Sequence, residues 1–357
     1  MDEVMKILVS DDVSEKGVEL LRQNGYTVDV ETNLDEDQLA ERIGEYDGLI
    51  TRSMTHVTAK VIEKAKKLKI VGRAGVGIDS IDLKAATARG IIVVNAPTSN
   101  TIAATEHTCA MILAVTRHIP QAHDSLMSGE WNREKFTGIQ LKDKTMGIIG
   151  VGRIGSRIAK RMQAMEMRTI GYDPYIPEER GKQLNCELVD LDTLLRESDY
   201  ITLHTPLTKE TRGMIGAEEI AKMKDGVRVI NVSRGAVLDI HVLAEALKIG
   251  KVAGAAVDVF PEEPLTSDIN PFKGMDNVVI TPHLGASTVE AQEGVSLDVA
   301  RSIMAGLKGE PVPTAVNMAP IAPGVYSTIR PYFDLMERMG IMGVYLAEAP
   351  MKEITVE

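Results

Sequence analysis

The chain alternates short β-type runs with helical patterns, and it does so in two separate series. The first series contains five short apolar runs, at 6–10, 27–30, 48–50, 70–72 and 91–94. The second contains six such runs, at 145–149, 168–172, 200–203, 227–231, 253–257 and 278–280. Strands that alternate with helices are typical of parallel sheets covered by helices on both faces. The sequence therefore predicts an α/β fold with two doubly wound, Rossmann-like parallel sheets.

Two long helical patterns lie outside these runs: the one at 101–118 falls between the two series, and the one at 287–306 closes the second. We expect them to cross between the two sheets, so that the first domain is discontinuous. A chain of 357 residues also exceeds one ordinary core, which rarely grows beyond ~250–300 residues. The expected parts are a substrate-binding domain (1–98 with 288–317), a cofactor-binding domain (99–287) and an incomplete C-terminal extension (318–357).

The charge balance restricts the partners that the chain can bind. Acidic residues outnumber basic ones by 51 to 40, which gives a net charge of −11. Such a field repels nucleic acids and anionic membranes, so we expect neither as a partner. An anionic substrate would need a local cluster of cations.

The cysteine and histidine content argues against a disulfide framework and against a metal site. The two cysteines, Cys109 and Cys186, lie far apart, and no pair of histidines has the spacing of metal ligands. The chain has no apolar run of ~18 residues and no signal-like N-terminus. We therefore expect a cytoplasmic protein without a bound metal.

A G-x-G-x-x-G motif, Gly150-Val151-Gly152-Arg153-Ile154-Gly155, follows the predicted strand 145–149 and opens a helix. Gly150 permits a tight turn, Gly152 lets the backbone approach a pyrophosphate, and Gly155 allows close packing of helix and strand. The next predicted strand ends at Asp173, whose carboxylate can accept hydrogen bonds from ribose hydroxyls. This pattern predicts NAD as the cofactor. Arg153 could swing across and offset Asp173, which leaves NADP as the alternative.

Three polar segments follow consecutive predicted strands of the second series, at 231–235, 257–264 and 281–287. Ligands of open α/β sheets bind beyond the carboxyl ends of the strands, where these segments lie. His283 can accept the hydroxyl proton of a hydroxy acid, and Glu263 can orient the imidazole and favour its protonated form. Arg234 can pair bidentately with a substrate carboxylate, and we assign its neighbours Val232 and Ser233 to the cofactor.

The motifs together resemble those of the D-isomer-specific 2-hydroxyacid dehydrogenases. The similarity covers about residues 6–317 and rests on 72–79, 95–97, 150–155, 231–235, 258–264 and 282–287. Residues 131–136 are similar to the phosphoglycerate branch of that family. The resemblance implies oxidation of 3-phospho-D-glycerate to 3-phosphohydroxypyruvate, the first step toward L-serine. It also implies a homodimer formed through the cofactor domain.

The resemblance also implies further site residues. Backbone N–H groups are expected to bind the substrate carboxylate at Gly75, Val76 and Gly77. The nicotinamide side is expected to be lined by Thr205, Pro206 and Asp258. For a substrate phosphate, the candidate residues are Arg52 with Ser53, and Arg133 or Lys135.

Two alternatives remain open at this point. A glyoxylate or hydroxypyruvate reductase would use the same chemistry on an unphosphorylated acid. An NAD-sensing corepressor or scaffold would use the fold without turnover, although the presence of Arg234, Glu263 and His283 argues against it. Residues 318–357 resemble only the opening of a regulatory extension, so feedback regulation is left unassigned.

Overall fold

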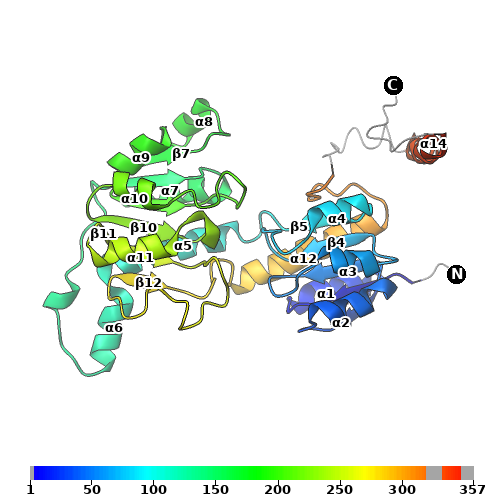
Figure 1. Ribbon diagram of the computed structural model, residues 1–357, viewed down its shortest axis with the longest axis horizontal. Coiled ribbons are helices and arrows are strands. Elements are labelled where there is room, and N and C mark those ends of the chain that lie inside the picture. The colour runs from blue at the N-terminus through cyan, green and yellow to red at the C-terminus, as the bar shows by residue number, and fades with distance from the viewer. Residues whose placement is uncertain (1–3, 319–331, 347–357) are drawn as a thin grey trace. The chain divides into compact units, whose positions relative to one another are not determined.

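The computed structural model describes residues 4–318 and 332–346. The chain divides into two compact units, which we describe separately (Figure 1). The first unit comprises Met1–Ala96 with Ser296–Glu357, and the second comprises Pro97–Val295. The assignment of substrate and cofactor domains with boundaries at 98 and 287 stays a prediction.

The first unit contains a five-stranded parallel sheet in the order β2-β1-β3-β4-β5. Its strands are β1 (Lys6–Val9), β2 (Thr27–Val30), β3 (Gly48–Thr51), β4 (Ile70–Arg73) and β5 (Ile92–Asn95). Its helices before β5 are α1 (Glu15–Gln23), α2 (Glu36–Arg42), the short η1 (Ile43–Glu45), α3 (Ala59–Lys64) and α4 (Leu83–Ala88). The strand order reverses between β1 and β3, so a ligand is expected beyond the ends of these two strands.

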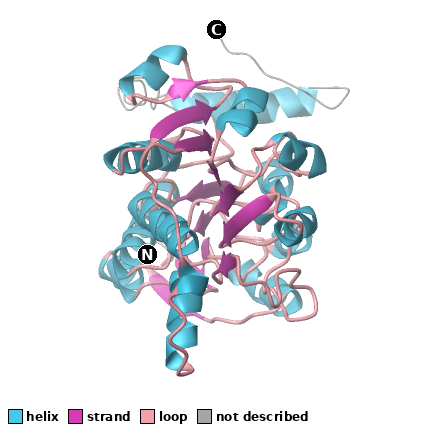
Figure 2. Cartoon of the chain, turned by 90° about the vertical axis from the view of Figure 1, so that its left-hand side faces the viewer, coloured by secondary structure: helices cyan, strands magenta, loops and turns pink. Residues whose placement is uncertain are grey.

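The second unit contains a seven-stranded parallel sheet in the order β12-β11-β10-β9-β6-β7-β8. Its strands are β6 (Thr145–Ile149), β7 (Arg168–Tyr172), β8 (Glu187–Leu188), β9 (Tyr200–Leu203), β10 (Val227–Asn231), β11 (Val252–Val257) and β12 (Val278–Ile280). The strand order reverses between β6 and β9. Figure 2 shows the strands in the middle and helices on both of their faces.

Helices and short 3-10 turns precede β6 and connect the strands that follow it. They are α5 (Thr101–Arg117), α6 (Ile119–Met127), η2 (Glu134–Phe136), α7 (Arg153–Ala164), α8 (Glu178–Gln183), α9 (Leu191–Glu197), α10 (Ala217–Lys222), η3 (Gly235–Val237) and α11 (Ile240–Lys248). The helix α12 (Val289–Leu307) begins in the second unit and ends in the first.

The sequence explains why these runs are strands buried between helices. Every residue of β3, β6 and β9 is buried, as expected for parallel strands covered on both faces. Acidic N-caps start several helices: the Asp35 side chain accepts from the Gln38 N–H at α2, and that of Asp190 accepts from the Thr193 N–H at α9. The predicted α/β class with two parallel sheets is confirmed.

The elements differ from the prediction in detail. The edge strand β8 was not predicted, because two residues carry no periodic signal. His118 has a φ of +53° and separates α5 from α6, whose first turn contains Pro120. Of the expected C-terminal extension, the structure describes α14 (Phe333–Leu346), whereas 319–331 and 347–357 lie outside the described residues. No helix within the described ranges is long and apolar enough to cross a membrane.

Candidate active site

The glycine motif forms the turn between β6 and α7, and close contacts explain two of its glycines. Gly150 has a φ of +89°, and a Cβ there would lie 2.7 Å from the carbonyl oxygen of His204. A Cβ on Gly155 would lie 2.1 Å from the carbonyl oxygen of Gly150. A Cβ on Gly152 would meet no atom within 4 Å, and no side chain caps α7. Open space beside an uncapped helix N-terminus suits a pyrophosphate. The motif residues Arg153 and Ile154 lie in the first turn of α7.

The end of β9 lies beside this turn, at the point where the strand order reverses. The Cγ2 atom of Thr205 lies 3.0 Å from the position of a Cβ on Gly150. The Thr205 Oγ1 atom is buried, and no group in the described part of the chain forms a hydrogen bond with it. A buried hydroxyl without a partner is unfavourable unless a ligand supplies one. Thr205 and the exposed Pro206 therefore fit the predicted cofactor side.

Asp173 follows β7 and contacts the glycine turn directly. Its Oδ2 atom accepts a hydrogen bond from the Val151 N–H at 2.9 Å, and its Oδ1 atom accepts one from the Tyr175 N–H at 3.0 Å. The side chain is half-buried, and each carboxylate oxygen keeps a lone pair for another donor. The position and chemistry of Asp173 therefore suit a ribose bound next to the turn.

His283 and Glu263 form a hydrogen-bonded pair. The His283 Nδ1 atom lies 2.8 Å from Glu263 Oε2, and Glu263 Oε1 accepts a hydrogen bond from the Phe260 N–H at 3.0 Å. An ionised carboxylate can only accept, so Nδ1 carries a proton, and in the neutral imidazole Nε2 keeps a lone pair. The structure thus brings the predicted base and its orienting carboxylate together.

The pKa of Glu263 is consistent with this pairing. Burial raises the pKa of the carboxyl group, but the hydrogen bonds from His283 and the Phe260 N–H outweigh it. The result is a pKa below the ordinary value. Glu263 is therefore ionised at neutral pH and remains an acceptor for His283.

Arg234 lies in the loop after β10, which packs against the loops that carry Glu263 and His283. A Cβ on Gly235 would lie 1.9 Å from the carbonyl carbon of Phe260, and one on Gly285 would lie 3.1 Å from Val232 Cγ1. The Arg234 guanidinium donates to the carbonyl oxygen of Ser233 at 2.7 Å. The three predicted loops are therefore in mutual contact at the carboxyl ends of β10, β11 and β12.

Asp258, at the end of β11, is enclosed by donors. Its side chain has 0% exposure. Its Oδ1 atom accepts from the Thr281 hydroxyl and from the Leu284 N–H at 2.7 Å, and its Oδ2 atom accepts from the Gly285 N–H at 2.9 Å. The His107 Nε2 atom lies 3.2 Å from Oδ1. Its predicted bond to the cofactor stays a prediction.

Sequence reasoning assigned no role to His107. The sequence contains only a weak indication of a role for His107: it is a polar residue within a long, largely apolar helix that has several buried residues. Asp11 was also not predicted to contribute to the site. It is buried after β1, where its carboxylate accepts from the Arg52 N–H and, at 3.0 Å, from the Thr55 hydroxyl.

In the first unit, the predicted substrate-binding residues follow neighbouring strands. Arg52 and Ser53 follow β3, at the reversal of the strand order, and Asp11 holds their loop. The 75–77 loop follows β4. The Gly75 N–H, predicted to bind the substrate carboxylate, donates to the carbonyl oxygen of Arg73 at 2.8 Å. The Asn95 side chain donates to the carbonyl oxygen of Val76 at 2.7 Å.

Arg133 and Lys135 lie in the second unit, at the exposed turn η2. The Lys135 ammonium pairs with Asp276 at 3.0 Å. An exposed pair of this kind contributes little stability and can exchange for another anion. The proposed contact of both residues with a substrate phosphate stays a prediction.

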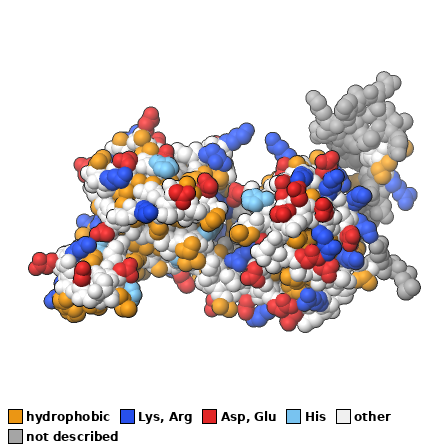
Figure 3. Space-filling model, turned by 60° about the horizontal axis from the view of Figure 1, so that its bottom comes forward, with side chains coloured by type: hydrophobic (Ala, Val, Ile, Leu, Met, Phe, Trp, Pro, Cys, Tyr) orange, Lys and Arg blue, Asp and Glu red, His pale blue; other side chains and the backbone are white. Residues whose placement is uncertain are grey.

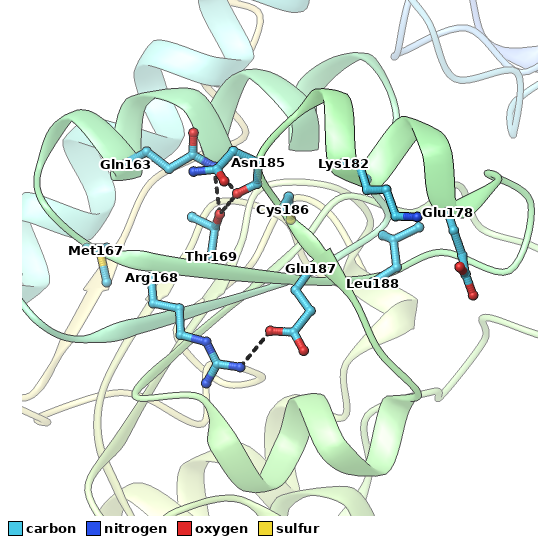
Figure 4. A pocket seen from close by; sticks show the side chains of 11 residues that line it. Gln163, Met167, Arg168, Thr169, Glu178, Lys182, Asn185, Cys186, Glu187 and Leu188 are labelled. Atoms are coloured by element: carbon cyan, nitrogen blue, oxygen red, sulfur yellow. Dashed lines mark hydrogen bonds and ion pairs between the residues drawn. The ribbon is translucent and has the colours of Figure 1, made fainter.

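A hollow of about 640 Å³ lies elsewhere in the second unit (Figure 4). It involves the amino end of β7, with α7, α8 and β8, whereas the predicted catalytic loops follow the carboxyl ends of the strands. Four of its polar side chains pair with one another: the Gln163 amide donates to Thr169 Oγ1 at 2.7 Å, and Arg168 pairs with Glu187 at 2.8 Å. Between residues 4 and 318 and in α14, no cluster of His, Cys, Asp and Glu is arranged to hold a metal ion.

Comparison with known proteins identifies the family. Residues 109–285 match the D-isomer specific 2-hydroxyacid dehydrogenase, NAD binding domain. The crystal structure of D-lactate dehydrogenase from Aquifex aeolicus, complexed with NAD and lactic acid, is 30% identical with a TM-score of 0.77. The match covers 85% of this chain and 96% of that one. The chain belongs to the D-isomer specific 2-hydroxyacid dehydrogenase family.

Other members of the family extend the comparison. A D-3-phosphoglycerate dehydrogenase from Bacillus subtilis is 42% identical over 99% of this chain and 67% of its own length. One from Archaeoglobus fulgidus is 49% identical over 94% of this chain, and the match covers 64% of that protein. This family member therefore spans about two thirds of the length of these relatives.

Proposed function

We propose that this family member is an NAD-dependent dehydrogenase that oxidises 3-phospho-D-glycerate to 3-phosphohydroxypyruvate. The main support is the His283–Glu263 pair, whose Nδ1 and Oε2 atoms lie 2.8 Å apart. The loops that carry this pair contact the loop that carries Arg234. Relatives of 42–49% identity named D-3-phosphoglycerate dehydrogenase support the substrate.

The chemistry divides among three side chains. Arg234 binds the substrate carboxylate and so orients C2 and its hydroxyl group. His283 accepts the hydroxyl proton at Nε2, and Glu263 holds the imidazole through Nδ1 and stabilises the positive charge that develops. Bound NAD supplies the hydride acceptor. In the reverse direction His283 returns the proton to the carbonyl oxygen.

The test is a set of initial rates with the full chain. We would measure NADH formation or consumption with 3-phosphoglycerate, phosphohydroxypyruvate, hydroxypyruvate, glyoxylate and 2-oxoglutarate, each with NAD(H) and NADP(H). A higher kcat/KM for the phosphorylated pair with NAD(H) is expected. A preference for hydroxypyruvate or glyoxylate would instead indicate a glyoxylate or hydroxypyruvate reductase. No turnover of any acid would favour the NAD-sensing corepressor or scaffold.

Replacing Arg52 tests more directly whether the substrate carries a phosphate group that this guanidinium binds. Arg52→Ala should raise KM for phosphohydroxypyruvate and leave KM for hydroxypyruvate unchanged, because only the phosphorylated acid would use the guanidinium. Arg180→Ala, on the exposed helix α8, is the matched control. An equal effect on both acids would contradict a phosphate contact.

A homodimer is part of the proposal. The helix α6 has no buried residue, and it and the segment after it expose Ile119, Leu126, Met127 and Trp131. Hydrophobic side chains are visible where α6 lies (Figure 3). A second copy of the chain is the occupant that we propose for this surface.

We also propose a cytoplasmic location. Cys109 and Cys186 are both free thiols, as is usual in a reducing compartment. Fractionation of cells that make the protein would test this, and recovery outside the cytoplasm would contradict it.

A further inference from the structure

The turn that carries His283 has an unfavourable backbone conformation. His283 has a φ of +55°, in the left-handed region that non-glycine residues seldom adopt. Its N–H donates to the carbonyl oxygen of Asp258 at 2.9 Å, and the next two N–H groups donate to the Asp258 carboxylate. Such a conformation persists only where surrounding contacts enforce it. Here Asp258 accepts from three consecutive N–H groups of the turn, and the His283 N–H also donates to the carbonyl oxygen of Thr281 at 3.0 Å.

Asp258 can hold the turn only if its carboxylate stays charged and correctly oriented. A buried carboxylate requires donors to remain ionised. Burial raises its pKa, but donors including His107, Thr281 and the Leu284 N–H outweigh this and lower the pKa below its ordinary value. Three of the surrounding donors belong to the loop after β12, and the fourth, His107, belongs to α5.

His107 joins a helix to this buried carboxylate. Its Nε2 atom lies 3.2 Å from Asp258 Oδ1 and 3.2 Å from Thr281 Oγ1. The Thr281 hydroxyl donates to Asp258, so its oxygen can accept from His107, whose Nε2 atom therefore carries a proton. The side chain is 19% exposed, and α5 packs against both β11 and β12. His107 thus contacts two residues that both accept from the His283 N–H: Asp258, at the end of β11, and Thr281, two positions before His283.

We propose that His107 is a positioning residue for the dehydrogenase reaction, because it orients Asp258 and Thr281 and thereby the turn that presents His283. This inference rests on the proposed function. His107 contacts no atom of the His283 side chain in the hydrogen bonds described, so its effect is indirect. Its loss should misplace the base without removing it, and small misplacements of a catalytic group are costly.

Two substitutions separate positioning from packing. His107→Leu fills the space but removes the donor, whereas His107→Gln retains an N–H donor near the place of Nε2. His107→Leu should lower kcat by about tenfold to a hundredfold, with KM for the acid within about twofold of the wild-type value. His107→Gln should recover most of kcat. His241→Leu, an exposed histidine on α11, controls for the loss of an imidazole from a helix.

An isotope effect supplies a readout that a packing role would not change. With 3-phospho-D-glycerate, or the panel acid with the highest kcat/KM, carrying deuterium at C2, the primary isotope effect on kcat should rise in His107→Leu. A misaligned base slows the chemical step relative to product release. An unchanged isotope effect together with an unchanged kcat would overturn the proposal.

Hydrogen exchange tests the same inference without any substrate. The amides of Leu284 and Gly285 should exchange at least about tenfold faster in His107→Leu than in the wild type, and His107→Gln should restore their protection. Unchanged exchange at both amides would refute the positioning role. Faster exchange in a protein that turns over no acid would refute the proposed function alone.

Discussion

At the scale of single residues, the proposed catalytic pair of Glu263 and His283 depends on opposing effects of burial and hydrogen bonding. Partial burial of Glu263 favours the neutral acid, and the donors His283 and Phe260 N–H favour the charged form. The donors prevail, so the pair consists of an acceptor carboxylate and an imidazole with a defined tautomer. The residue types could be read from the sequence, whereas the 2.8 Å contact required the fold.

Replacing the proposed base tests the assignment directly. His283→Asn should lower kcat by about 10²–10⁴-fold, the usual contribution of a general base. The measurement is steady-state NADH formation with the best acid of the panel. His241→Asn, on the exposed face of α11, should retain wild-type kcat. A loss below tenfold in His283→Asn would remove His283 from the mechanism.

The lowered pKa of Asp258 predicts how the free energy of unfolding depends on pH. Its pKa is lowered from the ordinary 3.8, so its stabilising contribution is complete above the unfolded-state pKa and is lost as pH falls through the folded value. Asp258→Asn should lower the free energy of unfolding by about 1–3 kcal/mol near pH 7, because an N–H donor loses its acceptor.

Urea unfolding at several pH values measures this effect. The difference between wild type and Asp258→Asn should shrink as pH falls below 3.8, because Asp258 is then protonated first in the unfolded state and, at lower pH, in the folded state. Asp268→Asn, at an exposed position, should show no such pattern. A difference that is constant with pH would mean that the charge of Asp258 does not stabilise the fold.

At the scale of elements, the β6–turn–α7 unit separates packing from binding. The chain at Gly155 is packed against Gly150, whereas the space beside Gly152 is open. Both glycines belong to one motif, and the sequence pattern already predicts packing for Gly155 and a ligand for Gly152. Their surroundings agree with this division: Gly155 permits the close approach of helix and turn, and the space beside Gly152 is open for the proposed cofactor.

Alanine at these two positions should therefore have different effects. Gly155→Ala should lower the free energy of unfolding by about 1–3 kcal/mol, because a Cβ would overlap backbone. Gly152→Ala should change stability by less than about 0.5 kcal/mol but weaken NADH binding. Urea unfolding and fluorescence titration with NADH measure the two effects. Equal loss of stability in both variants would contradict this division.

At the scale of the whole molecule, the acidic net charge of −11 requires local cations for an anionic substrate. The predicted cations come from both units: Arg52 from the first, Arg234 from the second. The exposed apolar side chains around α6 belong to the second unit, and the proposed role for them is assembly.

Assembly can be tested through these side chains. The wild-type chain, of 38.8 kDa, should have about twice this mass in solution by light scattering. Leu126→Glu with Met127→Glu should shift the mass toward that of one chain, because charges would be buried at the interface. Ile249→Glu, at an exposed apolar residue that ends α11, should leave the mass of the protein in solution unchanged. A monomeric wild type would refute the dimer.

The sequence by itself determined the features that depend on local chain properties. These are the alternation of strands and helices, the glycine turn with Asp173, and the three loops bearing Arg234, Glu263 and His283. Hydrophobic periodicity and turn-forming residues act over a few positions of the chain, so the sequence alone is enough to recognise them. The two-residue strand β8 carries too little of this signal.

Only the tertiary structure decided which distant groups satisfy the buried charges. His107 reaches Thr281 across 174 positions of the chain, and Asp11 holds the Thr51–Thr55 loop from 40 or more positions away. The need of a buried carboxylate for donors is general, but the identity of those donors depends on where separate helices and strands pack. The role inferred for His107 follows from that packing.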